Sequence, residues 1–228
     1  MVTTILIDLD DTIFDFRAQE RVAMADTLSA LGIAPTGKTL DLYHEINRAE
    51  WQRLERGETT RERLLTERFE KLFHRIGAAA SPALARATYE SKLASGHIFV
   101  DGAEEMLREL SREYDLYLIS NGTAHVQAGR LASAGILPYF RGVFISQAVG
   151  HNKPSPAFFD AVFAEIGEEK RGESVIVGDS LTSDILGGIG AGIPTVWFNP
   201  GGQAPDPRIP ATHTVSHLSE LAPLLKSI

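Results

Sequence analysis

The chain has 228 residues, of which 43% are hydrophobic and 23% are charged, the composition of an ordinary folded globular protein. It contains no cysteine, which excludes disulfide bonds, zinc sites built on thiolates and cysteine nucleophiles. The 22 lysines and arginines stand against 30 aspartates and glutamates, a formal net charge of −8, and they form no basic run. Because such a surface repels a phosphate polymer, we expect no nucleic acid partner.

The N-terminal segment is apolar from Met1 to Ile7, but Asp8, Asp10 and Asp11 follow before a signal-type hydrophobic region could form. No other stretch approaches the ~20 apolar residues that a membrane span requires. We therefore expect a cytoplasmic protein without membrane association.

Short apolar runs alternate with helical patterns along much of the chain. Each run is rich in Ile, Val, Leu or Phe and ends at an acid, Ser, Asn or Gly, as in parallel strands buried on both faces. The predicted strands are 3–9, 116–120, 142–146, 174–178 and 194–198, and the predicted helices between them are 103–113, 124–134, 156–166 and 183–191. This alternation predicts an α/β fold with a doubly wound parallel sheet, whose ligands bind at the carboxyl ends of the strands.

Residues 17–96 break this alternation because they contain no strand-like run. The segment lies between the first and second predicted strands, so we expect a helical domain inserted into an α/β core of residues 1–16 and 97–228. Such an insertion would stand over the carboxyl end of the first strand. Turn signals such as Gly57 and Gly77 separate its helices. The predicted helices are 17–31, 39–54, 60–76 and 82–93.

Carboxylates follow the first predicted strand. Asp8 and Asp10 are two residues apart, so in an extended chain their side chains point to the same side. Such a pair suits a bound metal, or a nucleophile beside a proton donor. The alternative is that these acids only cap a turn, as aspartates often do. Asp11 points to the opposite side, and we interpret it as a turn residue.

The fourth predicted strand also ends in acids. Asp179 follows Gly178, which permits close backbone approach, and Asp184 could reach back from the first turn of the next helix. Its alternative role is that of an acid at a helix start, where negative charge is favoured. Several converging carboxylates cannot all stay ionised without a cation. Oxygen ligands with open coordination positions favour Mg²⁺.

Groups suited to phosphate follow the second and third predicted strands. Ser120, Asn121 and Gly122 offer a hydroxyl, an amide and a permissive glycine, which suit a phosphate held by short donors and backbone N–H groups. Lys153 could neutralise charge on a nucleophile or a phosphoryl oxygen, although a lone lysine before proline is usually a surface residue. The arrival of a suitable residue at the same edge from four successive strands indicates an active site.

In this order, the motifs resemble those of the haloacid dehalogenase superfamily. The matching segments are Asp8-Leu9-Asp10-Asp11-Thr12, Ser120-Asn121-Gly122, Lys153-Pro154 and Gly178-Asp179-Ser180-Leu181-Thr182-Ser183-Asp184. The run GDSLTSDILGGIGAGIPTVWFN at 178–199 is most similar to the bacterial pyrimidine 5′-nucleotidase subgroup, and N-acylneuraminate-9-phosphatases look similar in the same run. The resemblance covers 1–16 and 97–228, and the helical insertion matches the family's cap.

The resemblance implies a phosphatase that works through an aspartyl-phosphate. Asp8 would attack phosphorus, and Asp10 would protonate the leaving oxygen and later deprotonate the hydrolytic water. Mg²⁺ would be bound by the Asp8 carboxylate, the Asp10 backbone carbonyl and Asp179, and Asp184 would support it. The implied holders of the phosphoryl group are Thr12, Ser120, Asn121 and Lys153.

Substrate choice is expected to lie in the insertion and in the linkers 14–16 and 95–97. Aromatic side chains there could stack on a nucleobase, although aromatics at helical spacing more often belong to a core. The candidates are Phe14, Phe16, Tyr43, Trp51, Phe69 and Tyr89.

The leading interpretation is a Mg²⁺-dependent phosphomonoesterase for nucleoside 5′-monophosphates, a monomer or small homo-oligomer whose partner is a small phosphorylated substrate. A phosphatase of sugar or acyl-sugar phosphates would use the same residues. A haloacid dehalogenase is less favoured, because carbon–halogen displacement needs neither Mg²⁺ nor the second acid, Asp10. A signalling receiver module is disfavoured because the second strand ends in Ser120 and Asn121, and because a cap is inserted. The intact motifs argue against an inactive binding protein.

Overall fold

The computed structural model describes all 228 residues. They form two compact units, an α/β unit of Met1–Asp15, Phe99–Gln127 and Gly135–Ile228 and a helical unit of Phe16–Ile98 and Ala128–Ala134. The main difference from the ranges expected from the sequence is the segment Ala128–Ala134, which groups with the helical unit.

A parallel sheet of six strands forms the centre of the α/β unit, in the order β3-β2-β1-β4-β5-β6. The predicted parallel α/β fold is therefore confirmed. The strands are β1 (Thr4–Asp8), β2 (Asp115–Ser120), β3 (Gly142–Ile145), β4 (Ser174–Gly178), β5 (Thr195–Phe198) and β6 (His213–Val215). The sixth was not among the predicted strands, because three residues with only one of them buried do not make an apolar run.

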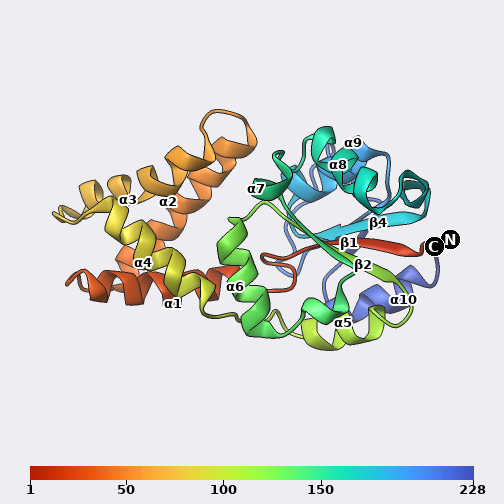
Figure 1. The fold of residues 1–228 in the computed structure, drawn as a ribbon, viewed down its shortest axis with the longest axis horizontal. Coiled ribbons are helices and arrows are strands. Elements are labelled where there is room, and N and C mark those ends of the chain that lie inside the picture. Colours follow the sequence, from red (N-terminus) through yellow and green to blue (C-terminus); the bar gives the residue numbers. More distant parts are fainter. The chain divides into compact units, whose positions relative to one another are not determined.

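Helices cover both faces of this sheet, with α8 and α9 on one side and α5 and α10 on the other (Figure 1). On the side of α8, Leu6, Tyr117 and Ile176 lie in register across the three central strands and pack in one core with Phe158 and Phe159. Because both faces are covered, β1 and β4 are buried along their whole length, which explains the apolar residues at their centres, 5–7 and 175–177. The helices of this part of the chain are α5 (Ala103–Leu110), α6 (Ala124–Ala134), α7 (Ser146–Val149), α8 (Pro156–Ile166), α9 (Leu186–Ala191) and α10 (Leu221–Leu225).

The helical unit contains the four helices that the turn signals predicted, with ends that differ from the predicted ones by a few residues. Thr36, Thr60 and Ser81 each accept a hydrogen bond from the backbone N–H three residues later and so cap a helix start. Gly77, in the left-handed conformation, ends one helix. The helices are α1 (Phe16–Ala30), α2 (Gly37–Glu55), α3 (Arg61–Ile76) and α4 (Pro82–Ala94).

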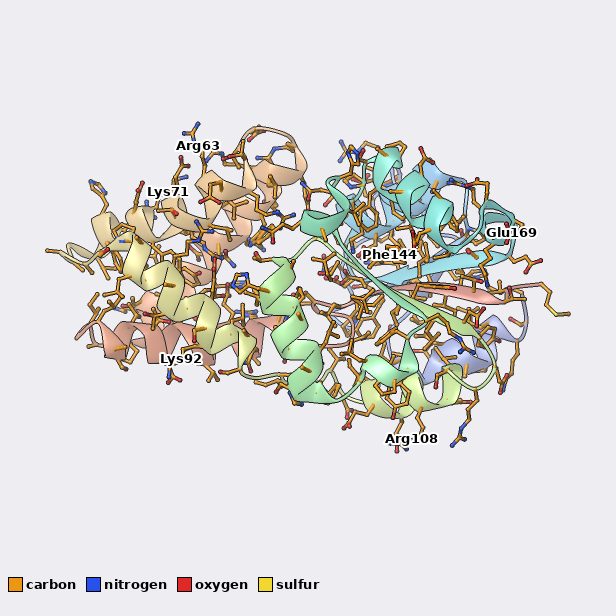
Figure 2. The ribbon with its side chains drawn as sticks, in the orientation of Figure 1. Arg63, Lys71, Lys92, Arg108, Phe144 and Glu169 are labelled. Atoms are coloured by element: carbon orange, nitrogen blue, oxygen red, sulfur yellow. The ribbon has the colours of Figure 1, made fainter.

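Charged side chains cover the outside of these helices, as Figure 2 shows for Arg63, Lys71 and Lys92. None of the helices in the chain combines the length and the hydropathy that a bilayer span would need.

Three aromatic rings form the centre of the helical unit. Tyr43, Phe69 and Tyr89 lie 5.4–5.7 Å apart by ring centroids, and none is more than 1% exposed. The guanidinium of Arg68 lies over the rings of Phe69 and Tyr89, 5.0 Å from each. The suggestion that these rings stack on a nucleobase is therefore wrong, because they are buried and pack against one another.

The other aromatic candidates divide between core and surface. Phe14 is fully buried in the α/β unit against Phe99. Phe16 and Trp51 keep part of their surface exposed, each under an arginine, Arg130 and Arg61 respectively. Of the six rings, only these two remain candidates for contact with a ligand.

We expect Phe69→Ala to lower the free energy of unfolding by about 3–5 kcal/mol, because it empties the centre of the aromatic cluster. Denaturant unfolding followed by circular dichroism measures the change. The matched control is Val22→Ala in α1, a residue that is 51% exposed and whose truncation should change stability by no more than about 0.5 kcal/mol. Similar effects of the two substitutions would contradict the assignment of Phe69 to the core.

Candidate active site

Polar side chains from several segments lie at the carboxyl edge of the sheet. Asp8 is the last residue of β1, Ser120 is the last of β2, and Asp179 directly follows β4. The parallel register sets Asp8 opposite Ile119, so the ends of β1 and β2 lie at the same level. Lys153 comes from the loop between α7 and α8. This edge therefore gathers residues that are far apart in the sequence.

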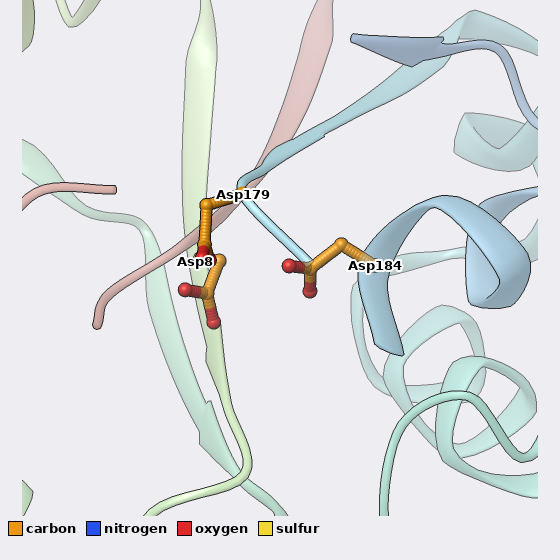
Figure 3. Close-up of side chains that lie close together, drawn as sticks. All are labelled: Asp8, Asp179 and Asp184. Atoms are coloured by element: carbon orange, nitrogen blue, oxygen red, sulfur yellow. The ribbon is translucent and has the colours of Figure 1, made fainter. Parts of the chain in front are cut away.

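Three carboxylates converge there (Figure 3). One oxygen from each of Asp8, Asp179 and Asp184 lies within 4.8 Å of the others. Asp184 belongs to a π-helical turn that precedes α9, and its Oδ2 accepts a hydrogen bond from the backbone N–H of Ser180 at 3.2 Å. A Cβ atom at Gly178 would lie 2.3 Å from Asp184 Oδ2. Glycine at this strand end therefore leaves the space that the Asp184 carboxylate occupies.

The ammonium group of Lys153 joins two of these carboxylates. Its Nζ donates to Asp8 Oδ1 at 2.5 Å and to Asp184 Oδ1 at 2.7 Å, and a third contact reaches the carbonyl oxygen of Ile119 at 3.4 Å. The residue is 1% exposed. The alternative that Lys153 is an ordinary surface lysine is therefore wrong.

The amide of Asn121 holds the backbone of Lys153. Asn121 Oδ1 accepts from the Lys153 backbone N–H at 2.8 Å, and its Nδ2 donates to the Lys153 carbonyl at 2.9 Å and to Ser183 Oγ at 3.2 Å. The structure thus places Asn121 against the lysine loop, where it fixes the start of the Lys153 side chain. Its contact with phosphate stays a prediction.

Burial and neighbouring charges shift the pKa values of the groups in this cluster. Burial raises the pKa of Asp8 to about 8, with the Lys153 charge acting in the opposite direction. Burial, together with the charge of Asp8, also raises the pKa of Asp179 well above its usual value. For Lys153, burial alone would lower the pKa, but the charges of Asp184 and Asp8 raise it above the ordinary value. In their ionised forms the three carboxylates outnumber the ammonium by two charges, and these oxygen ligands fit a hard divalent cation.

The Asp10 side chain has different partners. Its Oδ2 accepts a hydrogen bond of 2.6 Å from Nε2 of Gln127, which also donates to Ser120 Oγ at 3.0 Å. Gln127 lies on α6 and is 2% exposed. The sequence gives no signal for Gln127, because one glutamine on a helix has no spacing that distinguishes it from a surface residue. Its contact with Asp10 can be seen only in the folded chain.

A turn follows these two aspartates, Asp8 and Asp10. Asp11 has a φ of 60°, is exposed and donates its backbone N–H to the carbonyl of Phe14 at 2.7 Å, as expected of a turn residue. The hydroxyl of Thr12 is buried and has no hydrogen-bond partner. A buried hydroxyl in this state is uncommon in folded proteins. It leaves a polar group that a bound ligand could satisfy.

Residues 2–192 match the family model of haloacid dehalogenase-like hydrolases. The chain belongs to this family. The resemblance stated from the motifs is thereby confirmed, and the protein is a hydrolase.

Relatives of this hydrolase match it over most of their length. The HAD-hydrolase YfnB of Bacillus subtilis is 36% identical over 222 residues, which are 97% of this chain and 94% of that protein. A crystal structure of YfnB bound to magnesium superposes with a TM-score of 0.93 and covers 98% of both chains. Two relatives are pyrimidine 5′-nucleotidases. PynA of Streptococcus pneumoniae is 38% identical over 86% of this chain and 83% of its own, and YjjG of Escherichia coli is 30% identical over 97% and 96%.

The stability of this hydrolase without metal should fall as pH rises from about 4 to about 8. In that window Asp8 keeps its proton in the folded chain, where its pKa is about 8. In the unfolded chain the pKa of Asp8 is near 3.8, so the proton is lost. One such group changes the free energy of unfolding by up to about 1.4 kcal/mol per pH unit. Urea unfolding of the wild type and of Asp8→Asn in EDTA measures the difference in slope. Parallel pH profiles for the two proteins would contradict the raised pKa.

Proposed function

We propose that this hydrolase is a phosphatase of small phosphomonoesters, and that pyrimidine nucleoside 5′-monophosphates are its preferred substrates. The observation that carries the proposal is the different environment of two aspartates at one strand end. Asp8 lies with Asp179, Asp184 and Lys153, whereas the carboxylate of Asp10 lies on the amide of Gln127. Carboxylates in such unlike surroundings can act as nucleophile and as acid. The pyrimidine 5′-nucleotidases PynA and YjjG support the substrate class.

In the first step, a carboxylate oxygen of Asp8 attacks phosphorus and forms an aspartyl-phosphate. The bond from phosphorus to the ester oxygen breaks, and the proton of Asp10 passes to that oxygen, so the product leaves as a neutral alcohol. Lys153 touches the attacking carboxylate and offsets negative charge as the phosphate dianion approaches. The hydroxyls of Thr12 and Ser120 are the proposed donors to the phosphoryl oxygens.

In the second step, water attacks the phosphorus of the aspartyl-phosphate. Asp10, now ionised, takes a proton from this water, and the bond between phosphorus and Asp8 breaks. Inorganic phosphate leaves, and Asp8 is a carboxylate and Asp10 an acid as at the start. The same residue serves as acid and then as base, which requires that it stay in one position through both steps.

The acidic cluster fits Mg²⁺ because it consists of oxygen ligands with an excess of negative charge. The proposed ligands are the carboxylates of Asp8 and Asp179 and the backbone carbonyl of Asp10, with Asp184 in support. When bound, Mg²⁺ would reduce the repulsion between the Asp8 carboxylate and the phosphate. Without it, Lys153 alone opposes the charges of three carboxylates.

The inserted helical segment, residues 17–96, is proposed as the cap that sets substrate choice. The buried cluster of Tyr43, Phe69 and Tyr89 gives it a rigid centre. Phe16 and Trp51 are the proposed candidates for stacking on a base. Cytoplasmic location and a monomeric or small homo-oligomeric state stay predictions.

A sugar-phosphate or N-acylneuraminate-9-phosphate phosphatase is the nearest alternative, because it would use the same residues. Dehalogenation fits less well. A halide leaves without a proton, so the reaction has no use for an acid such as Asp10.

The test measures phosphate release from UMP, dUMP, dTMP, AMP, GMP and a set of sugar phosphates, with Mg²⁺ and with EDTA, and halide release from 2-chloropropionate. We expect metal-dependent phosphate release that is fastest with the pyrimidine nucleotides. Release confined to sugar phosphates would overturn the nucleotide assignment and keep the chemistry. Halide release without phosphate release would overturn the phosphatase itself.

We expect Lys153→Ala to reduce phosphate release by at least ~100-fold, the scale of losing a donor that stabilises developing charge. The matched control is Lys226→Ala, an exposed lysine paired with Glu113 in the same unit, which should keep wild-type activity. Circular dichroism confirms that each variant is folded. A loss of less than about tenfold in folded Lys153→Ala would contradict its proposed role.

A further inference from the structure

We propose that Gln127 is a positioning residue for both steps of the reaction. Its amide holds the carboxyl group of Asp10 in one orientation, and it directs the hydroxyl hydrogen of Ser120 to the phosphoryl group. This inference rests on the proposed phosphatase function and names a residue outside the family motifs quoted above.

One nitrogen atom makes both contacts. Nε2 of Gln127 lies 2.6 Å from Asp10 Oδ2 and 3.0 Å from Ser120 Oγ. An amide nitrogen carries two hydrogens, so it can donate to both oxygens at once. Asp10 follows β1 and Ser120 ends β2, hence one buried side chain from α6 connects the ends of two neighbouring strands.

The contacts of Ser120 fix the direction of its hydroxyl. Ser120 Oγ accepts from Gln127 Nε2 and also from the backbone N–H of Gly122, at 3.0 Å each. A serine hydroxyl has two lone pairs and one hydrogen. With both lone pairs occupied by N–H donors, the hydrogen must point elsewhere. Ser120 is thereby set as a donor, the role that a phosphoryl oxygen requires.

The contact with Asp10 fixes the orientation of its carboxyl group. Oδ2 accepts the N–H of Gln127 at 2.6 Å, so rotation of the carboxyl group would break this hydrogen bond. In the proposed reaction the acid form gives a proton to the leaving oxygen, and the ionised form later takes a proton from water. A carboxyl group held in one orientation can serve both steps.

Gly122 provides the space for this amide. A Cβ atom at residue 122 would lie 2.2 Å from Gln127 Nε2 and 2.7 Å from its Cγ. Any larger residue would push the side chain of Gln127 away from its two partners. Gly122→Ala is therefore a second way to disturb the contact that leaves Gln127 itself unchanged.

The competing explanation is that Gln127 only joins α6 to the sheet. The two explanations differ in how the effect depends on the leaving group. An alkyl ester such as UMP needs a proton on its leaving oxygen, whereas p-nitrophenyl phosphate has a leaving group that departs as an anion. Loss of acid positioning must therefore slow the alkyl ester more, and loss of stability must affect both esters equally.

The experiment compares kcat/KM of wild type and Gln127→Met with p-nitrophenyl phosphate and with the alkyl monophosphate that the wild type hydrolyses fastest. Methionine nearly keeps the length of glutamine and removes both N–H donors. The parameter kcat/KM reports the step in which the ester bond breaks, not the later hydrolysis of the aspartyl-phosphate. We expect a loss of about 10-fold or more with the alkyl ester, part of the 10²–10⁴ that a general acid supplies. With p-nitrophenyl phosphate we expect at most about one-third of that loss.

The matched control is Gln147→Met. Gln147 Oε1 accepts from the backbone N–H of Ala124 at the start of the same helix α6, at 2.8 Å, and it is expected to change neither rate by more than about twofold. Melting midpoints show that the variants are folded, and Gly122→Ala should give the same dependence on the leaving group. Equal losses with both esters, or no loss, in Gln127→Met and Gly122→Ala overturn the inference. A wild type that hydrolyses neither ester overturns the proposed function before any variant is compared.

Discussion

A buried ammonium group held between two carboxylates is the interaction on which the rest of the site depends. Lys153 contacts Asp8 and Asp184 with almost no exposure to water. Removing such a charge from water costs several kcal/mol, which only well-placed partners can offset. The position of the ammonium is accordingly fixed from both ends, since Asn121 holds its backbone and the absent side chain of Gly178 leaves room for Asp184. These constraints connect the ends of three strands, one loop and one helical turn.

The same edge of the sheet separates two carboxylates that are two residues apart. Asp8 ends its strand inside the charged cluster, where Lys153 donates to it. Asp10 stands just before the left-handed Asp11, and its Oδ2 accepts a hydrogen bond from the amide of Gln127. In the proposed reaction, one short segment thus supplies both a nucleophile and a proton donor, with a different hydrogen-bond donor for each.

Most of the strands and helices of this architecture can be predicted from the amino-acid sequence, because general physical rules restrict which residues can form them. Strands buried on both faces must be apolar without interruption, and helix starts need a capping side chain, so both could be located in the sequence. No comparable sequence pattern predicts that a single polar side chain is buried. Lys153 before a proline is typical of a surface, and Gln127 has no special spacing. Aromatics such as Tyr43 and Phe69 have the same helical spacing in a core as in a pocket, and only the packed bundle places them in the core.

The fold alone does not determine which bond this hydrolase breaks, because an aspartate nucleophile on the same fold can displace different leaving groups. The leaving group makes the difference. A halide departs as a stable anion, but an alkoxide is a strong base and leaves readily only when it receives a proton. A carboxyl group close to the nucleophile, with one oxygen fixed by an amide, suits the second case. The contact between Gln127 and Asp10 thus supports the proposed hydrolysis of a phosphate ester over cleavage of a carbon–halogen bond.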